Sequence, residues 1–372
     1  MSTPASIRPK ALKPGDTIAF ISPSARFNVS CAKAIASASA VLTKRGYQVR
    51  EIFHPVTPDT IQNNISSRLI EFREAFTDPT VAAVICTIGG TTFTELLPSL
   101  LEDVELHAAI RAHPKIVLGC SDITGLHWFL NAATGLRTFY GPGMIPELVP
   151  SESGSEEELS TLEFTVRNLL AAVATTEPIG DVERSKWYNP FLQESLLRPE
   201  SGAPLGAGKV SPNPGWTWIR KGRGPVQGRL FGGFLMVMAR LAGVRALAPN
   251  WTGRIVFLET AISDHDPTAG NPLERVQAGI ADLVAQGVFD KAAGLVVGRP
   301  FGYNTPEQLE AYMGVIRGLL CGGRLAEKNP DFPILFGIDI GHTTPMLTLP
   351  YDALAELDGE NDRFTILEPG VV

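Results

Sequence analysis

The sequence predicts an α/β protein, with a parallel sheet in its first half and a second α/β unit in its second half. Three observations predict this fold. Short apolar runs alternate with helical segments as far as residue 132. The runs are continuously apolar, which is typical of strands buried on both faces of a parallel sheet. The chain has 372 residues, enough for about two domains.

The first half repeats the order strand, helix. Its apolar runs follow turn residues and are short enough for strands, as in TIAFIS after Pro14-Gly15-Asp16. Its first helical segment is rich in Ala and stops at Gly46, a common residue at helix C-termini. We expect strands at 17–22, 47–53, 81–87 and 115–120, and helices at 30–46, 65–76, 94–101, 103–112 and 124–132.

The composition changes at residues 150–160, an acidic stretch that leads into a helix expected at 157–173. Residues 175–227 are rich in Pro, Gly, Trp and Arg, and long irregular stretches of this kind are usually functional loops or linkers. Strands and helices then mix again. We expect a Gly-rich turn into a helix at 228–242, strands at 254–259, 293–297, 333–337, 346–349 and 364–367, and helices at 273–286 and 305–320.

Composition excludes several classes of protein. The net charge is −7, from 32 basic and 39 acidic residues, which argues against a nucleic-acid-binding surface. The N-terminus lacks the apolar core of a secretory signal, and no run of about 18 apolar residues predicts a membrane span. The four cysteines show no metal-binding or redox spacing, which favours reduced thiols in a cytoplasmic protein.

Ser121 lies between an apolar strand and a helix, in Gly119-Cys120-Ser121-Asp122. A serine at such an elbow is lifted clear of the sheet, and the N–H groups that follow it favour negative charge. Both features suit a nucleophile that generates an oxyanion. The alternative is that Ser121 or Asp122 only caps the helix. The G-x-S-x-G elbow of α/β-hydrolases is absent.

Gly89 and Gly90 follow the neighbouring strand, at the same predicted edge of the sheet. Two glycines allow a turn with positive φ and an N–H that faces the cleft, which would supply a second oxyanion donor. An ordinary tight turn is the alternative. The G-x-G-x-x-G fingerprint of dinucleotide-binding proteins is not met, so a nucleotide-dependent enzyme is disfavoured.

Glu259 and His342 complete a candidate set for catalysis. Glu259 ends the apolar strand IVFLE, where a buried carboxylate needs a partner such as an imidazole N–H. His342 lies between Gly341 and Thr343 at a strand end, and histidine is the usual base near neutral pH. A salt bridge at the rim of the sheet and a solvated loop histidine are the alternatives. His127, on an apolar helix, is expected to be packed.

These residues and several short motifs resemble the LD-carboxypeptidases, serine peptidases that include muramoyl-tetrapeptide carboxypeptidases and the microcin C immunity peptidase. The similarity covers nearly the whole chain. The motifs that carry it, in chain order, are Leu12–Ile18, Ser22–Ser24, Thr87–Gly90, Gly119–Thr124, Tyr140–Pro142, Gly228–Gly233, Phe257–Glu259, Gly287–Asp290 and Gly341–Thr343.

The resemblance implies a triad of Ser121, Glu259 and His342, with an oxyanion hole from the backbone of Asp122 and the Gly89-Gly90 turn. It implies a Rossmann-like N-terminal domain, a C-terminal domain with a small barrel-like sheet, a homodimer, and no metal or cofactor. Together with the pattern above, it divides the chain into a nucleophile-bearing domain at 1–170, a linker and active-site loop at 171–227, and a domain carrying Glu259 and His342 at 228–372.

Two positions bear on the substrate. The Thr87-Ile88-Gly89-Gly90 form and the loop around Trp187 are more similar to the microcin-immunity branch, which cleaves aminoacyl-nucleotide amides. That similarity implies that Trp187 stacks on the substrate, whereas the alternative is plain loop packing. At Phe234, the resemblance expects a polar residue, and a large apolar ring there puts the usual substrates in question.

The sequence therefore predicts a serine hydrolase that cleaves an amide bond of a small peptide-like or aminoacyl substrate. Two other functions stay open. An amine or carbon nucleophile could intercept the acyl-enzyme, which would make the protein an acyltransferase or cyclase. The fold could also serve a catalytically silent binding protein.

Overall fold

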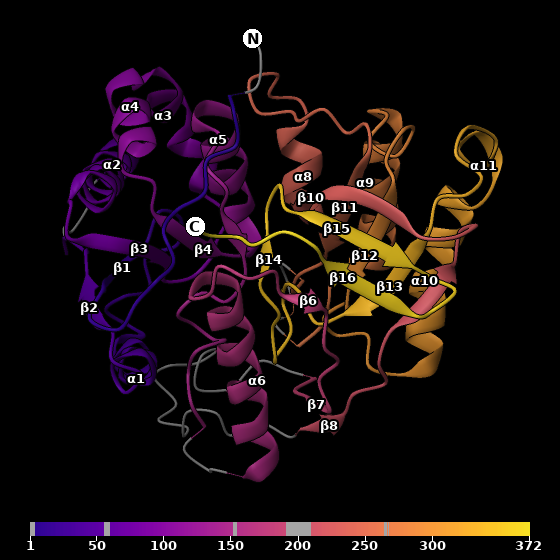
Figure 1. Cartoon of the computed structure of the whole chain (residues 1–372), viewed down its shortest axis with the longest axis horizontal. Helices are drawn as coiled ribbons and strands as arrows, with labels where there is room; N and C mark the ends of the chain where they lie inside the picture. The colour runs from indigo at the N-terminus through magenta and orange to yellow at the C-terminus, as the bar shows by residue number, and fades with distance from the viewer. Residues whose placement is uncertain (1–3, 56–59, 152–154, 191–209, 264–265, 267) are drawn as a thin grey trace.

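A computed structural model describes residues 4–55, 60–151, 155–190, 210–263, 266 and 268–372. Two mixed α/β parts lie side by side, the N-terminal part in indigo and purple and the C-terminal part in orange and yellow (Figure 1). Each part is built on its own large sheet. The predicted α/β class, with a parallel sheet in the first half and a second sheet in the second, is therefore confirmed.

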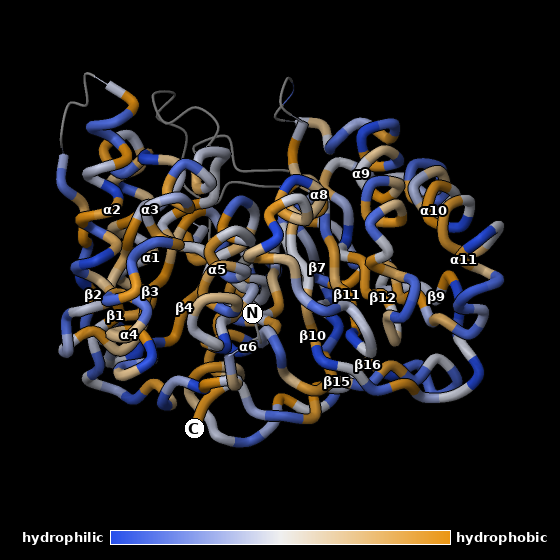
Figure 2. The backbone as a smooth tube through the Cα atoms, turned by 90° about the horizontal axis from the view of Figure 1, so that it is seen from above, coloured by the Kyte–Doolittle hydropathy of each residue, from blue (hydrophilic) through white to orange (hydrophobic). Residues whose placement is uncertain are grey.

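The first sheet has the strand order β14-β5-β4-β3-β1-β2, and all its pairings are parallel except that between β14 and β5. Its central strands carry almost only apolar residues and are coloured accordingly in Figure 2. Burial on both faces explains why these runs do not alternate. The strands are β1 (Thr17–Ile21), β2 (Gln48–Glu51), β3 (Val81–Cys86), β4 (Ile116–Gly119), β5 (Phe139–Tyr140) and β14 (Leu349–Pro350).

The helices of this part follow the strands in alternation. The described helices up to residue 173 are α1 (Ala32–Thr43), α2 (Ile61–Thr77), η1 (Phe93–Glu95), α3 (Leu97–Glu102), α4 (Val104–Ala112), η2 (Ser121–Ile123), α5 (Thr124–Thr134) and α6 (Glu156–Val173). The short helix η2 matters most for the site, because it joins β4 to α5 and begins at Ser121.

The second sheet has the order β6-β16-β15-β10-β11-β12-β13-β9. Its four central strands, β10 to β13, pair in parallel, and the outer strands pair antiparallel. Among the described residues, no pairing joins the edge strands β6 and β9. The strands are β6 (Gly180–Asp181), β9 (Thr217–Arg220), β10 (Val226–Phe234), β11 (Arg254–Glu259), β12 (Gly294–Gly298), β13 (Ile334–Ile338), β15 (Leu354–Asp358) and β16 (Arg363–Ile366).

Two sequence expectations are corrected in this part. The first half of 228–242 is strand β10, not a turn, and α8 (Leu235–Leu241) follows it directly. The described part of 175–227 contains short strands, including β7 (Trp187–Tyr188) and β8 (Ser211–Pro212), which pair with each other. Residues 191–209 of the expected active-site loop lie outside the described residues. The remaining helices are α9 (Leu273–Ala285), α10 (Pro306–Leu320) and α11 (Gly323–Lys328).

One hydrophobic cluster runs through both parts, from Val84 in the first sheet to Phe257 in the second. Helix α5 lies at this seam. Its Trp128 is fully buried, packs against Trp251, and donates its indole N–H to the Gly232 carbonyl at 2.8 Å. Replacing a buried aromatic residue of this size by Ala typically costs about 3–5 kcal/mol. The relative position of the two sheets is thus fixed by packing, which matters because the site draws on both.

No helix within the described residues is both long enough and apolar enough to cross a membrane.

Candidate active site

Ser121 stands at the carboxyl end of β4, as the first residue of η2. Its φ is +62°, a left-handed backbone conformation that is uncommon for a residue with a side chain. A sharp, strained turn between strand and helix is the device by which other hydrolases expose a nucleophilic serine above a sheet. The predicted elbow at Ser121 therefore has a sharp backbone turn of this kind.

The structure brings Ser121, His342 and Glu259 together. Nε2 of His342 lies 3.0 Å from Oγ of Ser121, and Nδ1 lies 2.8 Å from Oε2 of Glu259. Glu259 ends β11 and is fully buried, whereas the His342 side chain keeps 16 % of its surface exposed. Because Nδ1 donates to the carboxylate, Nε2 is left to accept the proton of the serine hydroxyl.

The charges around His342 favour its protonated form. Burial alone would lower the pKa of His342, but the negative charge of Glu259, its hydrogen bond and the nearby Glu147 outweigh burial and raise the pKa. An imidazolium at position 342 is thereby stabilised.

Tyr140 joins the two sides of the site, and the sequence did not single out this residue. Its hydroxyl donates to Oε1 of Glu259 at 2.5 Å and accepts the backbone N–H of Ser121 at 3.1 Å. Burial and the charge of Glu259 raise the pKa of Tyr140 well above its ordinary value, so the phenol stays protonated. The one sequence signal was its place in the Tyr140-Gly141-Pro142 motif.

The Gly89-Gly90 turn lies against the serine. A Cβ atom on Gly89 would be 2.7 Å from Cβ and 2.9 Å from Oγ of Ser121, closer than real side chains approach. Gly90 has a φ of +140°. The main chain can therefore approach Ser121 this closely only because residue 89 has no side chain.

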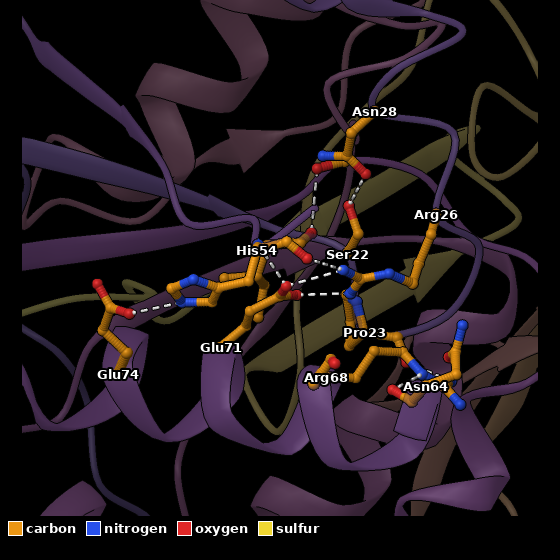
Figure 3. Close-up of polar contacts among 12 residues, drawn as sticks. Ser22, Pro23, Arg26, Asn28, His54, Asn64, Arg68, Glu71 and Glu74 are labelled. Atoms are coloured by element: carbon orange, nitrogen blue, oxygen red, sulfur yellow. Dashed lines mark hydrogen bonds and ion pairs between the residues drawn. The ribbon is translucent and has the colours of Figure 1, made fainter. Parts of the chain in front are cut away.

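A polar network holds the loop that follows β1 (Figure 3). Arg26 forms a two-pronged ion pair with Glu71, which also accepts the backbone N–H of His54 at 2.7 Å. Farther along the loop, Ser24 donates to the carboxylate of Asp122 at 2.6 Å. The N–H of Ala25 bonds to the Gly89 carbonyl at 3.0 Å. The loop thus supports both the glycine turn and the residue after the nucleophile.

The side chain of Asp122 has a structural role, because its carboxylate is fully engaged in hydrogen bonds. It is buried and accepts hydrogen bonds from the N–H of Phe93 at 2.8 Å and from Arg240 of α8 at 2.7 Å. This leaves only its backbone for the oxyanion role that the resemblance implies. The guanidinium of Arg240 comes from the second part of the chain, so this pair also ties the two parts together.

A cavity of about 310 Å³ opens at Ser121 and His342. The residues Gly89, Gly90, Glu147 and Phe234 also line it. The Phe234 ring packs edge-on against the His342 ring at 5.6 Å between centroids. Phe234 also borders a second cavity of about 640 Å³, whose lining includes Arg240 and Arg275. The apolar ring at position 234 therefore lies against His342, in the wall of the cavity that Ser121 also lines. Its contact with substrate stays a prediction.

Trp187 lies elsewhere. It belongs to β7 and lines a separate hollow of about 290 Å³ beside α6, together with Arg167 and Arg184. Asn189, two residues on, does line the Ser121 cavity. The predicted contact between Trp187 and substrate stays a prediction.

Within the described residues, no group of three or more His, Cys, Asp and Glu side chains is arranged to hold a metal ion. His127 is packed, as expected. It is fully buried, bonds to Thr138 and to the Gly119 carbonyl, and burial lowers its pKa to about 4. A neutral imidazole there supports the strand that leads into Ser121.

Profiles of two domains match this chain: the LD-carboxypeptidase N-terminal domain over residues 18–141 and the LD-carboxypeptidase C-terminal domain over residues 227–357. The chain belongs to the LD-carboxypeptidase family. The predicted family is thus confirmed, and with it the prediction that the chain is a serine peptidase that hydrolyses peptide bonds.

Two relatives match over most of both chains. A protein of Vibrio cholerae named as a carboxypeptidase is 30 % identical over 364 residues, 96 % of each chain. The microcin C7 self-immunity protein MccF of Escherichia coli is 28 % identical over 363 residues, which covers 95 % of this chain and 94 % of MccF.

Solved structures agree with this assignment. An MccF-like protein of Bacillus anthracis superimposes with a TM-score of 0.80 at 27 % identity. The match covers 98 % of the present chain and all of the Bacillus anthracis chain. MccF has been solved in complex with aspartyl sulfamoyl adenosine, with a TM-score of 0.78 at 25 % identity, covering 98 % of this chain and all of that one.

Proposed function

We propose that Ser121, His342 and Glu259 act as a catalytic triad that cleaves an amide bond in a small peptide-like or aminoacyl substrate. The observation that carries this proposal is the continuous chain of hydrogen bonds from the Ser121 hydroxyl through the imidazole to a buried carboxylate. Serine hydrolases on unrelated folds use the same arrangement.

In the proposed reaction, Nε2 of His342 takes the proton of Ser121 while Oγ attacks the carbonyl carbon. The backbone N–H groups of Asp122 and Gly90 stabilise the oxyanion. His342 then gives its proton to the leaving amine, which breaks the amide bond and leaves an ester on Ser121. A water molecule, deprotonated by His342, hydrolyses the ester and restores the serine. Glu259 keeps the imidazole oriented and balances its charge throughout.

Replacement of Ser121 by Ala tests the proposal. We expect the Ser121→Ala protein to fold as the wild type does and to lose activity by roughly 10³-fold or more, because the nucleophile is gone. Release of adenosine-containing product from aspartyl sulfamoyl adenosine, and of D-amino acids from LD-peptides, measures the loss. Full activity in the Ser121→Ala protein would show that Ser121 is not the nucleophile.

Acyl transfer is the second candidate function, favoured by the contact between the apolar Phe234 ring and His342. An apolar ring at the reacting groups disfavours water and leaves room for an amine or carbon nucleophile to take the acyl group. Mass spectrometry of the products, with and without an added amine, separates transfer from hydrolysis. Labelling of Ser121 by an active-site serine probe separates both from a catalytically silent binding protein.

Several finer predictions belong to the same proposal. They are a homodimer, a cytoplasmic location, catalysis without a metal or cofactor, a contact from Trp187 or Phe234 to the substrate, and the domain boundaries at 170 and 227. Light scattering in solution tests the homodimer, and limited proteolysis tests the boundaries.

A further inference from the structure

We propose that Glu147 binds the ammonium group of the substrate, so that the enzyme selects acyl groups that carry a free amine close to the bond it cleaves. This inference rests on the proposed function, because it assigns a substrate class to the same cavity. Neither the sequence motifs nor the triad geometry calls for a carboxylate at this place.

The position of Glu147 is the first argument. Its side chain lines the cavity that also contains Ser121 and His342, and only 6 % of the residue is exposed. Among the described residues that line this cavity, Glu147 is the one carboxylate. A cation bound to it would therefore lie in the same space of about 310 Å³ as the scissile carbonyl.

The lack of a cationic side chain at Glu147 is the second argument. Its Oε2 accepts the backbone N–H of Gly143 at 3.0 Å, but no Lys or Arg of the described chain forms an ion pair with it. Two other buried carboxylates do have such a partner: Glu71 has Arg26, and Asp122 has Arg240. A buried charge without a partner is costly, and a bound cation removes that cost.

The surroundings of Glu147 are the third argument. Burial and, less strongly, the negative charge of Glu259 raise its pKa, whereas its own backbone N–H, His342 and the Gly143 N–H act to lower it. The net result is a pKa of about 7. The neighbouring Cys120 is buried, and burial raises the pKa of its thiol, which keeps it neutral. A substrate ammonium would favour the charged form of Glu147, whereas a carboxylate or phosphate at this place would be repelled.

The experiment compares two ligands that differ only in the amine. Aspartyl sulfamoyl adenosine carries the α-ammonium group, and succinyl sulfamoyl adenosine lacks it. Calorimetry measures binding of both to the Ser121→Ala protein, which cannot turn them over. We expect the aspartyl compound to bind roughly tenfold or more tightly, as is typical of a charge-assisted hydrogen bond at a buried site.

Glu147→Gln, added to Ser121→Ala, removes the charge and keeps the shape and a hydrogen-bond acceptor for Gly143. We expect this change to bring the ratio of the two dissociation constants, succinyl to aspartyl, close to one. The dissociation constant of the succinyl compound itself should change little. Glu163→Gln makes the same charge change on an exposed residue of α6 outside the cavity and should preserve the preference. A preference that survives Glu147→Gln would overturn the assignment to Glu147.

The Ser121→Ala protein tests the inference even if Glu147→Gln does not fold. Failure of that protein to bind the aspartyl compound more tightly than the succinyl compound overturns the inference. Hydrolysis by the wild type is measured separately: equal hydrolysis of both compounds would contradict ammonium selection and leave the serine mechanism standing. Tight, amine-dependent binding without hydrolysis would support the Glu147 subsite and contradict the proposed cleavage.

Discussion

The two sheets contribute to the candidate active site by different physical means. The first sheet contributes backbone geometry: Ser121 has a left-handed φ, and Gly89 approaches it so closely that no side chain fits between them. The second sheet contributes buried charge: Glu259 is fully buried at the end of β11 and holds His342 from one side. Tyr140 bonds to both Ser121 and Glu259 and couples the two contributions.

This difference implies that the two sides respond differently to substitution. Backbone geometry depends on steric space, so a single added methyl group should disturb it while the charges stay unchanged. The buried pair depends on ionisation, so an isosteric change that removes one charge should disturb it while the backbone stays unchanged. Substitutions on the two sides can therefore be told apart by their effect on the pH profile.

The largest effect is expected on the charge side, from Glu259→Gln. Losing the carboxylate removes the group that orients His342 and stabilises its charged form, so we expect kcat to fall by roughly 10³–10⁴-fold. Glu259 raises the pKa of His342, so its removal lowers that pKa. Because His342 must be neutral to act as a base, the rising limb of the kcat/KM profile should shift to lower pH.

The control for this change is Glu310→Gln, which removes a charge from an exposed residue of α10. Its activity and pH profile should match those of the wild type. If Glu259→Gln lowers kcat but leaves the rising limb where it was, the limb belongs to a group other than His342.

A smaller effect is expected on the geometry side, from Gly89→Ala. The added methyl group would lie 2.7 Å from Cβ of Ser121, so the serine or the glycine turn must move. Misplacement of a reacting group by about 1 Å can cost roughly 10²-fold in rate. We expect kcat to fall by about 10- to 100-fold with the pH profile unchanged, because no charge is altered.

Gly314→Ala is the matched control, since a methyl group on this helical glycine meets no atom within 4 Å. It should leave the rate unchanged and raise the stability by about 0.5–1 kcal/mol. A shifted pH profile in Gly89→Ala would contradict the separation between geometry and charge.

The same contrast explains what could be predicted from the sequence. Ser121, Glu259 and His342 could be picked out because each stands at the end of a run that already indicates a strand. Tyr140 could not be assigned a role, because its partners Ser121 and Glu259 come from different parts of the chain and meet only in the folded protein. Glu147 could not be assigned one either, because the cavity that it shares with Ser121 and His342 exists only after folding. Such residues show no local period or spacing to detect.

Strand β10 was missed for a related reason. Its Gly232-Gly233 pair locally indicates a turn, because glycine disfavours strands. In the structure, a Cβ atom on Gly232 would lie 1.7 Å from the carbonyl oxygen of Phe257 on the adjacent strand β11. Glycine is therefore required at position 232 because strand β11 passes so close to it. The two paired residues, Gly232 and Phe257, are 25 positions apart in the sequence, so no local sequence pattern reveals the contact.

The smallest effect is expected on stability, and it measures the free-energy cost of the left-handed backbone conformation at Ser121. A side chain at φ +62° is strained, whereas glycine adopts this conformation freely. Glycine also increases the conformational entropy of the unfolded chain, which stabilises the unfolded state and offsets part of the stability gained by removing the backbone strain. We therefore expect Ser121→Gly to be as stable as Ser121→Ala or more stable, by up to about 1 kcal/mol, in denaturant unfolding. At Ala36, an exposed position in α1 with helical backbone, the change to Gly should instead cost about 1 kcal/mol. If Ser121→Gly, compared with Ser121→Ala, lost as much unfolding free energy as the change to Gly at Ala36, Ser121 would be held by its side-chain contacts and not by a strained backbone. The contribution of the first sheet to the site would then rest on side chains, as that of the second sheet does.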